Sequence, residues 1–131
     1  MSLIICVFTP NGIIYNDKIK ELILPTRNGQ VGILPGHAAL ITVLDINVIT
    51  FRKKNKLSWN AIAVIAGFAC VKHKQVIILV NRAHKKDSVN RKGAEKSLKE
   101  AMNYLSIVVD DLSKVEASLF FKKARIIYQI L

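Results

Sequence analysis

The sequence is short of cysteine, proline, tryptophan and acidic side chains, and several of these shortages exclude a class of protein. Its two cysteines, Cys6 and Cys70, both lie within apolar runs, so we expect free, buried thiols and no disulfide framework. The apolar stretch 57–71 is interrupted by polar residues and is too short to span a bilayer. Hydrophobic residues make up 51% of the chain, which is too many for a disordered protein.

Reactive groups in a catalytic arrangement are also missing. None of His37, His73 and His84 has a partner at H-E-x-x-H spacing or lies within a Cys/His cluster. The chain contains no phosphate-binding P-loop, no dinucleotide-binding glycine motif and no nucleophile elbow. We therefore expect no catalytic residues, no metal and no cofactor.

The charge is strongly positive, with 20 Lys and Arg against nine Asp and Glu and a net charge of +11. Such a field attracts nucleic acid, a membrane surface or an acidic protein, and composition does not choose among them. The aromatic residues do not alternate with basic ones as in a nucleic-acid groove. The nearest approach is Phe51-Arg52-Lys53-Lys54, which we expect to enter a hairpin tip. A small basic β-domain that binds nucleic acid, with an affinity that falls steeply with salt, remains the alternative function.

Up to residue 85, short β-branched segments alternate with turn residues. We expect turns at 10–12 and 25–29, and a break between two strands at Gly67. The predicted strands cover residues 3–8, 18–24, 31–34, 39–44, 47–51, 57–65, 68–71 and 76–80. This spacing is typical of an antiparallel sandwich or barrel.

After residue 85 the apolar period becomes helical. The first predicted helix has Ala94, Leu98, Ala101 and Leu105 on one face, and either Ser88 or Asn90 could cap it.

A second helix is predicted to begin near Asp110 and Asp111, where acids suit the amino end. Ser113 and Glu116 could instead form a capping box one turn later. Its predicted apolar face contains Leu112, Val115, Leu119 and Ile126 or Ile127. The predicted fold is therefore α+β, with an N-terminal antiparallel β-sandwich (1–86) followed by a C-terminal antiparallel two-helix hairpin (87–131).

Several segments match one family in order and spacing. Gly-Gln-Val-Gly-Ile-Leu-Pro-Gly-His-Ala at 29–38 resembles the signature loop of the epsilon subunit of F-type ATP synthase, and the opening segment 3–11 resembles the chloroplast branch of that family. The segments 66–69, 76–81 and 119–125 match as well, so the resemblance covers essentially the whole chain.

The resemblance implies a rotor subunit of the central stalk, which couples proton flow to ATP synthesis and restrains ATP hydrolysis through its C-terminal helices. The implied partners are the gamma subunit, the ring of c subunits and, through the helices, the beta and alpha subunits, with no nucleic acid. The implied location is the stromal side of the plastid (chloroplast) thylakoid membrane, touched only indirectly through the complex.

The resemblance also assigns site residues. The c-ring and gamma contact would comprise Gly29, Gln30, Gly32, Pro35, Gly36 and His37, although turn geometry alone could explain the glycines, the proline and the histidine. Lys122, Lys123 and Arg125 would form the basic contacts of the inhibitory helix, or else a solvated face favoured by the helix dipole.

One family motif is degenerate. Bacterial members that bind regulatory ATP carry Ile/Leu-Asp-x-x-Arg-Ala, and here Val89, Asn90, Gly93 and Ala94 occupy the four defined positions. Since the Asp and the Arg are both replaced, we expect no ATP site. The link at 107–111 is also unusually apolar, and a degenerate plastid copy that assembles without inhibiting stays open as a further alternative.

Overall fold

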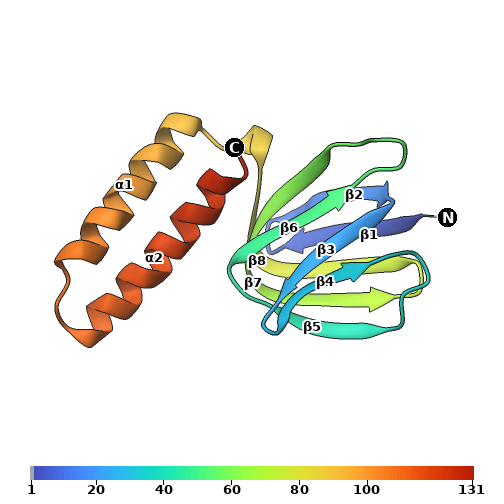
Figure 1. The fold of residues 1–131 in the computed structure, drawn as a ribbon, viewed down its shortest axis with the longest axis horizontal. Coiled ribbons are helices and arrows are strands. Elements are labelled where there is room, and N and C mark those ends of the chain that lie inside the picture. The colour runs from blue at the N-terminus through green and yellow to red at the C-terminus, as the bar shows by residue number, and fades with distance from the viewer. Residues whose placement is uncertain (1) are drawn as a thin grey trace. The chain divides into compact units, whose positions relative to one another are not determined.

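A computed structural model describes residues 2–131, and the chain divides between Ala83 and His84 into a β unit and a helical unit (Figure 1). The β unit holds eight strands among these residues. They are β1 (Leu3–Thr9), β2 (Gly12–Ile19), β3 (Glu21–Thr26), β4 (Gly29–Ile33), β5 (Leu40–Leu44), β6 (Asn47–Arg52), β7 (Trp59–Lys72) and β8 (Gln75–Lys85).

The strands hydrogen-bond in the order β2-β1-β8-β7-β5-β3-β4, and β6 pairs with both β3 and β7. The predicted sandwich is confirmed, with one correction to the antiparallel pairing. Strands β1 and β8 run parallel, with Ile5 opposite Val76 and Val7 opposite Ile78. A parallel pair needs a long crossover, and here the crossover is nearly the whole unit, from the end of β1 to the start of β8.

Alternating apolar side chains fill the core of the β unit. Leu3, Ile5 and Val7 of β1 are fully buried, and so are Val76 and Ile78 of the parallel partner. Phe51 is the largest fully buried side chain, and its ring lies 4.9 Å from that of Tyr15. This period of two is what a half-buried strand requires.

The predicted strand 18–24 is wrong, because it joins the end of β2 to the start of β3. The chain bends at Lys20, and the mixed polar sequence of β2 hid that strand. The predicted turn at 25–29 is also too long. Pro25 lies inside β3 opposite Gln30, and the turn is closed by the Thr26 hydroxyl, which donates to the Gly29 carbonyl at 2.6 Å.

The expected break at Gly67 is wrong too, since β7 continues through it for 14 residues. Ala66 has a φ of +53°, which marks an irregularity in the strand. A Cβ built on Gly67 would collide with the Leu79 carbonyl oxygen and lie 2.8 Å from the Cα of Val80. Gly67 is therefore needed for close approach to β8.

The helical unit contains a short 3-10 turn (Lys86–Ser88) and two helices, α1 (Arg91–Ile107) and α2 (Asp111–Gln129). Asn90 caps α1, with its side-chain oxygen accepting from the Gly93 amide at 3.2 Å. Asp110 caps α2 in the same way through the Ser113 amide at 3.0 Å. That hydrogen bond lowers the pKa of the Asp110 carboxyl, as expected for a cap that favours the charged form.

The two helices contact each other mainly through small side chains. Ala94 and Ala101 of α1 and Ala117 and Ala124 of α2 are buried. The predicted inner face of α2 is therefore partly wrong. Ile126 is buried, but Leu112, Val115 and Leu119 are exposed.

We expect Gly67→Ala to lower the free energy of unfolding by about 3 kcal/mol, because the added methyl meets backbone that cannot move without separating β7 from β8. Gly32→Ala is the matched control: a Cβ there meets nothing within 4 Å, so its change should stay within about 0.5 kcal/mol. Urea unfolding followed by circular dichroism measures both. Equal stability of the two variants would contradict the close approach.

Candidate functional site

The residues of the signature segment lie along β4 and in the loop that follows it. Gly29 and Gly36 have φ values of +114° and +88°, which favour glycine over any residue with a side chain. Gln30 and Gly32 are exposed on β4, whereas Pro35 is half-buried in the loop. The structure thus spreads this segment from the β3–β4 turn to the β4–β5 loop, and does not gather it into one pocket.

Two hydrogen bonds hold the loop in place. The Gly36 amide donates to the His73 carbonyl at 2.7 Å, which joins the loop to the β7–β8 turn. The His37 amide donates to the Leu34 carbonyl at 3.1 Å, and the His37 ring nitrogen Nδ1 lies 2.7 Å from the Ala38 carbonyl. These contacts suit a turn role for His37 and leave its ring half-exposed.

The sequence reasoning missed an exposed apolar surface on the β unit. We call it the outer apolar face, and it consists of Ile4, Ile41, Val43, Phe68 and Leu79. These residues come from β1, β5, β7 and β8, which are neighbours in the sheet. Phe68 lies directly opposite Val43 in the β5–β7 pairing, and 55% of Phe68 is exposed. Val43, Phe68 and Leu79 lie on the adjacent strands β5, β7 and β8, and an exposed apolar surface of this kind is typical of a protein-binding site.

The three basic residues of α2 lie near its C-terminal end and point in more than one direction. Lys122 and Arg125 are three residues apart and so share a side of the helix, whereas Lys123 is turned about 100° away from Lys122. Lys123 lines a groove of about 430 Å³ between the helices, together with Glu116 and Phe120. The Arg125 guanidinium lies 6.0 Å from the centre of the Phe121 ring.

Leu112, Val115 and Leu119 form a second exposed apolar surface, which we call the α2 stripe. They follow each other at three- and four-residue spacing, so they lie along one side of the helix. The exposed fractions of these side chains are 70% for Leu112, 57% for Val115 and 46% for Leu119.

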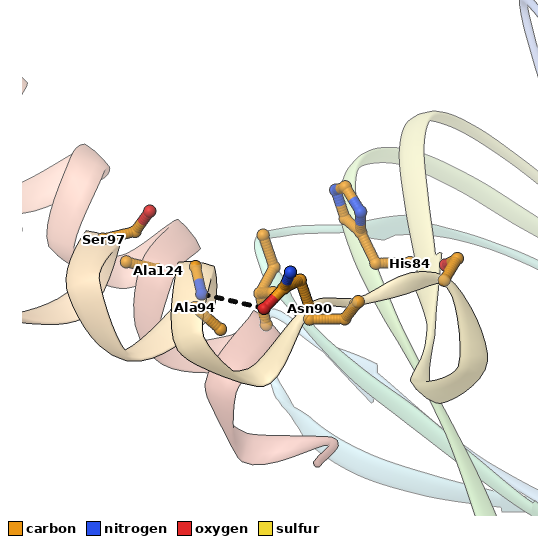
Figure 2. A pocket seen from close by; sticks show the side chains of 9 residues that line it. His84, Asn90, Ala94, Ser97 and Ala124 are labelled. Carbon is orange, nitrogen blue, oxygen red and sulfur yellow. Dashed lines mark hydrogen bonds between the residues drawn. The ribbon is translucent and has the colours of Figure 1, made fainter.

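The degenerate nucleotide motif lines a cavity of about 300 Å³ within the helical unit (Figure 2). Asn90 stands between His84 and Ser97 in this view, and its side-chain oxygen is already used as the helix cap. Ala94, Ala124 and Ile127 add apolar walls. No lysine or arginine lines this cavity, so it offers no cation for a triphosphate.

Residues 2–131 contain neither a candidate metal site nor a helix that could span a membrane. No group of three or more His, Cys, Asp or Glu side chains in this part of the chain could hold a metal ion. Neither α1 nor α2 is long and apolar enough to cross a membrane. Cys6 and Cys70 are both free thiols, but only Cys6 is buried as predicted, and Cys70 is partly exposed. Burial raises the pKa of the Cys6 thiol.

Comparison with known proteins gives one consistent family. Residues 2–86 match the family model described as ATP synthase, delta/epsilon chain, beta-sandwich domain. The chain is 42% identical over 130 residues to the chloroplastic ATP synthase epsilon chain of Tupiella akineta, covering 99% of this chain and 98% of the relative. It is 44% identical to the protein of the same name from Oltmannsiellopsis viridis, covering 100% and 98%.

Two solved structures share the fold. One is a chain of the Euglena gracilis mitochondrial ATP synthase, in a structure of OSCP, F1 and the c-ring, with a TM-score of 0.80 at 17% identity over 95% of this chain and 78% of that chain. The other belongs to the central stalk and c-ring of the Tetrahymena thermophila mitochondrial ATP synthase, with a TM-score of 0.63 at 18% identity over 98% and 96%.

We expect no ATP binding at micromolar concentrations, because no lysine or arginine lines the cavity. Isothermal titration calorimetry of the full chain tests this directly. The double variant Asn90→Asp with Gly93→Arg restores the family's charge pattern, and we expect it to gain measurable affinity. A micromolar affinity of the unaltered chain would contradict the prediction.

Proposed function

The chain belongs to the ATP synthase delta/epsilon chain family, and from this we propose that it is an epsilon subunit of the central stalk of a proton-driven plastid ATP synthase. The resemblance inferred from the sequence is thereby confirmed. The observation that carries the proposal is similarity at about 40% identity over essentially full length to proteins named chloroplastic ATP synthase epsilon chain. Such a subunit is not catalytic, and its location would be the stromal side of the thylakoid.

We assign the gamma subunit to the outer apolar face. A stalk subunit must hold its neighbour through every rotation, and burial of apolar area is the largest non-directional source of such affinity. Phe68 and Ile41 are the large exposed side chains that could anchor this contact. The half-exposed His37 and the fixed loop around Gly36 come close along the chain to Ile41 on β5, so the signature segment would border the same interface.

We assign the c-ring contact to the β3–β4 turn. Gln30 is exposed there beside Gly29, on a hairpin whose strands are paired from Leu22–Ile33 to Thr26–Gly29. The amide of Gln30 can donate and accept hydrogen bonds with the polar loops of a c subunit. It carries no charge, so this contact would depend little on salt.

We assign the restraint of ATP hydrolysis to the helical unit. Lys122, Lys123 and Arg125 would face acidic side chains of the catalytic beta subunit, and the α2 stripe would supply apolar contact beside them. Ion pairs that lose water on docking are stronger than exposed ones, and salt still weakens the approach. A plastid copy that assembles but no longer inhibits is the second reading, favoured by the apolar link at Val108 and Val109.

We expect the intact chain to inhibit ATP hydrolysis by an epsilon-depleted chloroplast catalytic head, and a chain truncated after Lys86 to inhibit little. The triple variant Lys122→Ala, Lys123→Ala, Arg125→Ala should raise the inhibitory concentration about tenfold, since it removes three charge-assisted contacts. The control is Lys92→Ala with Lys99→Ala, which removes positive charge from α1 and leaves α2 unchanged. If no form inhibits but the chain still binds gamma, the subunit has lost its brake.

We expect Phe68→Asp to weaken binding to the gamma subunit at least about tenfold, because a carboxylate would be buried without a partner. Leu57→Asp makes the same change at a side chain that is 90% exposed on another part of the β unit, and it should leave this affinity unchanged. Surface plasmon resonance with immobilised gamma measures both. If no form of the chain binds gamma, the nucleic-acid reading takes first place.

A further inference from the structure

We propose that the hairpin between β6 and β7 binds an anionic lipid surface directly. We call this hairpin the basic tip; it consists of Arg52, Lys53, Lys54 and Lys56 with Leu57 and Trp59 beside them. The proposal goes beyond the function proposed above and does not rest on it. It also differs from the expectation that membrane contact is only indirect.

Charge is concentrated at the basic tip and is not neutralised there. Residues 46–86 contain nine Lys and Arg and no Asp or Glu. Two acids from β2 and β3 reach the base of the tip, where Asp17 pairs with Lys53 at 3.1 Å and Glu21 pairs with Arg52. Among residues 2–131, no ion pair holds Lys54 or Lys56, and both are exposed. The two outermost lysines therefore keep their full positive field.

Apolar side chains are exposed on the same tip. Leu57 is 90% exposed, which is the highest value among the large hydrophobic residues described, and Trp59 is 46% exposed. The Arg52 guanidinium lies 5.7 Å from the centre of the Trp59 ring. Lysines beside an exposed leucine and a half-exposed tryptophan match the chemistry of a membrane interface, where cations meet headgroups and amphipathic rings sit among them.

Further basic residues lie at the same end of the β unit. The Lys20 amide donates to the Arg52 carbonyl at 2.8 Å, so Lys20 lies next to the basic tip. The bend at Lys20 follows directly on Ile19, which pairs with Leu3, and the neighbouring Ile4 amide donates to the Lys74 carbonyl at 2.9 Å. Lys20 and Lys74 are both exposed, so positive charge continues from the basic tip toward the β7–β8 turn.

Lipid fits this surface better than nucleic acid does. Single-stranded nucleic acid is held by aromatic faces on which bases stack. Arg52 already stands over the ring of Trp59, and Leu57 provides no stacking surface.

Trp59 is the only tryptophan in the chain, so its fluorescence reports on the basic tip alone. The full chain is titrated with vesicles of 70% phosphatidylcholine and 30% phosphatidylglycerol, and with pure phosphatidylcholine vesicles. We expect a blue shift of Trp59 emission and quenching by brominated acyl chains with the anionic vesicles only. Flotation gives the partition coefficient, which 0.5 M salt should lower strongly.

Two pairs of variants distinguish the contribution of the basic tip from the contribution of net charge. A lysine near an anionic surface contributes about fivefold to binding, so Lys54→Glu with Lys56→Glu should lower the partition coefficient at least about 25-fold. Lys99→Glu with Lys114→Glu changes net charge equally in the helical unit and should have a much smaller effect. Leu57→Ser should reduce the blue shift while leaving most of the electrostatic attraction. All five positions are exposed, so the variants should fold.

Three results would overturn the proposal. The chain could fail to bind anionic vesicles, the two charge variants could lose binding equally, or a fluorescein-labelled single-stranded oligonucleotide could bind through the tip at physiological salt while vesicles do not. None of these results bears on the predictions for gamma binding and for inhibition of hydrolysis, because both are measured without lipid.

Discussion

The irregularity at Ala66 and Gly67 sets which side chains of the β unit face inward. Before it, Ile62 and Val64 belong to the core, and after it Ala69 and Val71 do, so the inward positions change from even to odd numbers. One extra residue in a strand has this effect, because the side chains alternate with a period of two. Without the shift, Phe68 would face the core and Ala69 the outside. The exposure of Phe68, one of the large side chains of the outer apolar face, depends on this one step in the backbone.

The same step decides how β7 is shared. Its first half pairs with β6 and its second half with β5, so one strand connects two parts of the sheet that would otherwise have separate edges. Gly67 permits this irregularity within β7 by allowing the Leu79 backbone to approach closely. A larger residue would have to move β8, and β8 in turn carries β1 through the parallel pairing. Fold and candidate partner surface are therefore constrained by the same residue.

The sequence predicted the features that depend on local chemistry. Asn90 is one of the two caps predicted for α1, and the structure confirms it. The acids at Asp110 and Asp111 predict the amino end of α2, where Asp110, and not Ser113, is the cap. The signature loop is identified by its resemblance to a family, and the predicted strand 31–34 within it overlaps β4. What failed was any distinction between a buried and an exposed apolar residue. Leu119 and Ile126 are both large and apolar, but Leu119 is 46% exposed and Ile126 is buried, and the sequence pattern does not separate them.

A similar distinction applies to the positive charge. The β unit has ten basic and three acidic residues up to Ala83, and a lysine-rich composition alone gives no reason to single out any of them. The hydrogen bond with Lys53 lowers the pKa of Asp17, so this carboxylate stays charged and pairs with Lys53 at the base of the basic tip. Lys54 and Lys56 differ from other surface lysines because Leu57 and Trp59 lie beside them. Positive charge attracts an anionic surface from a distance, and an exposed apolar side chain in the same loop can insert into that surface on contact. This combination is recognised only in the folded hairpin.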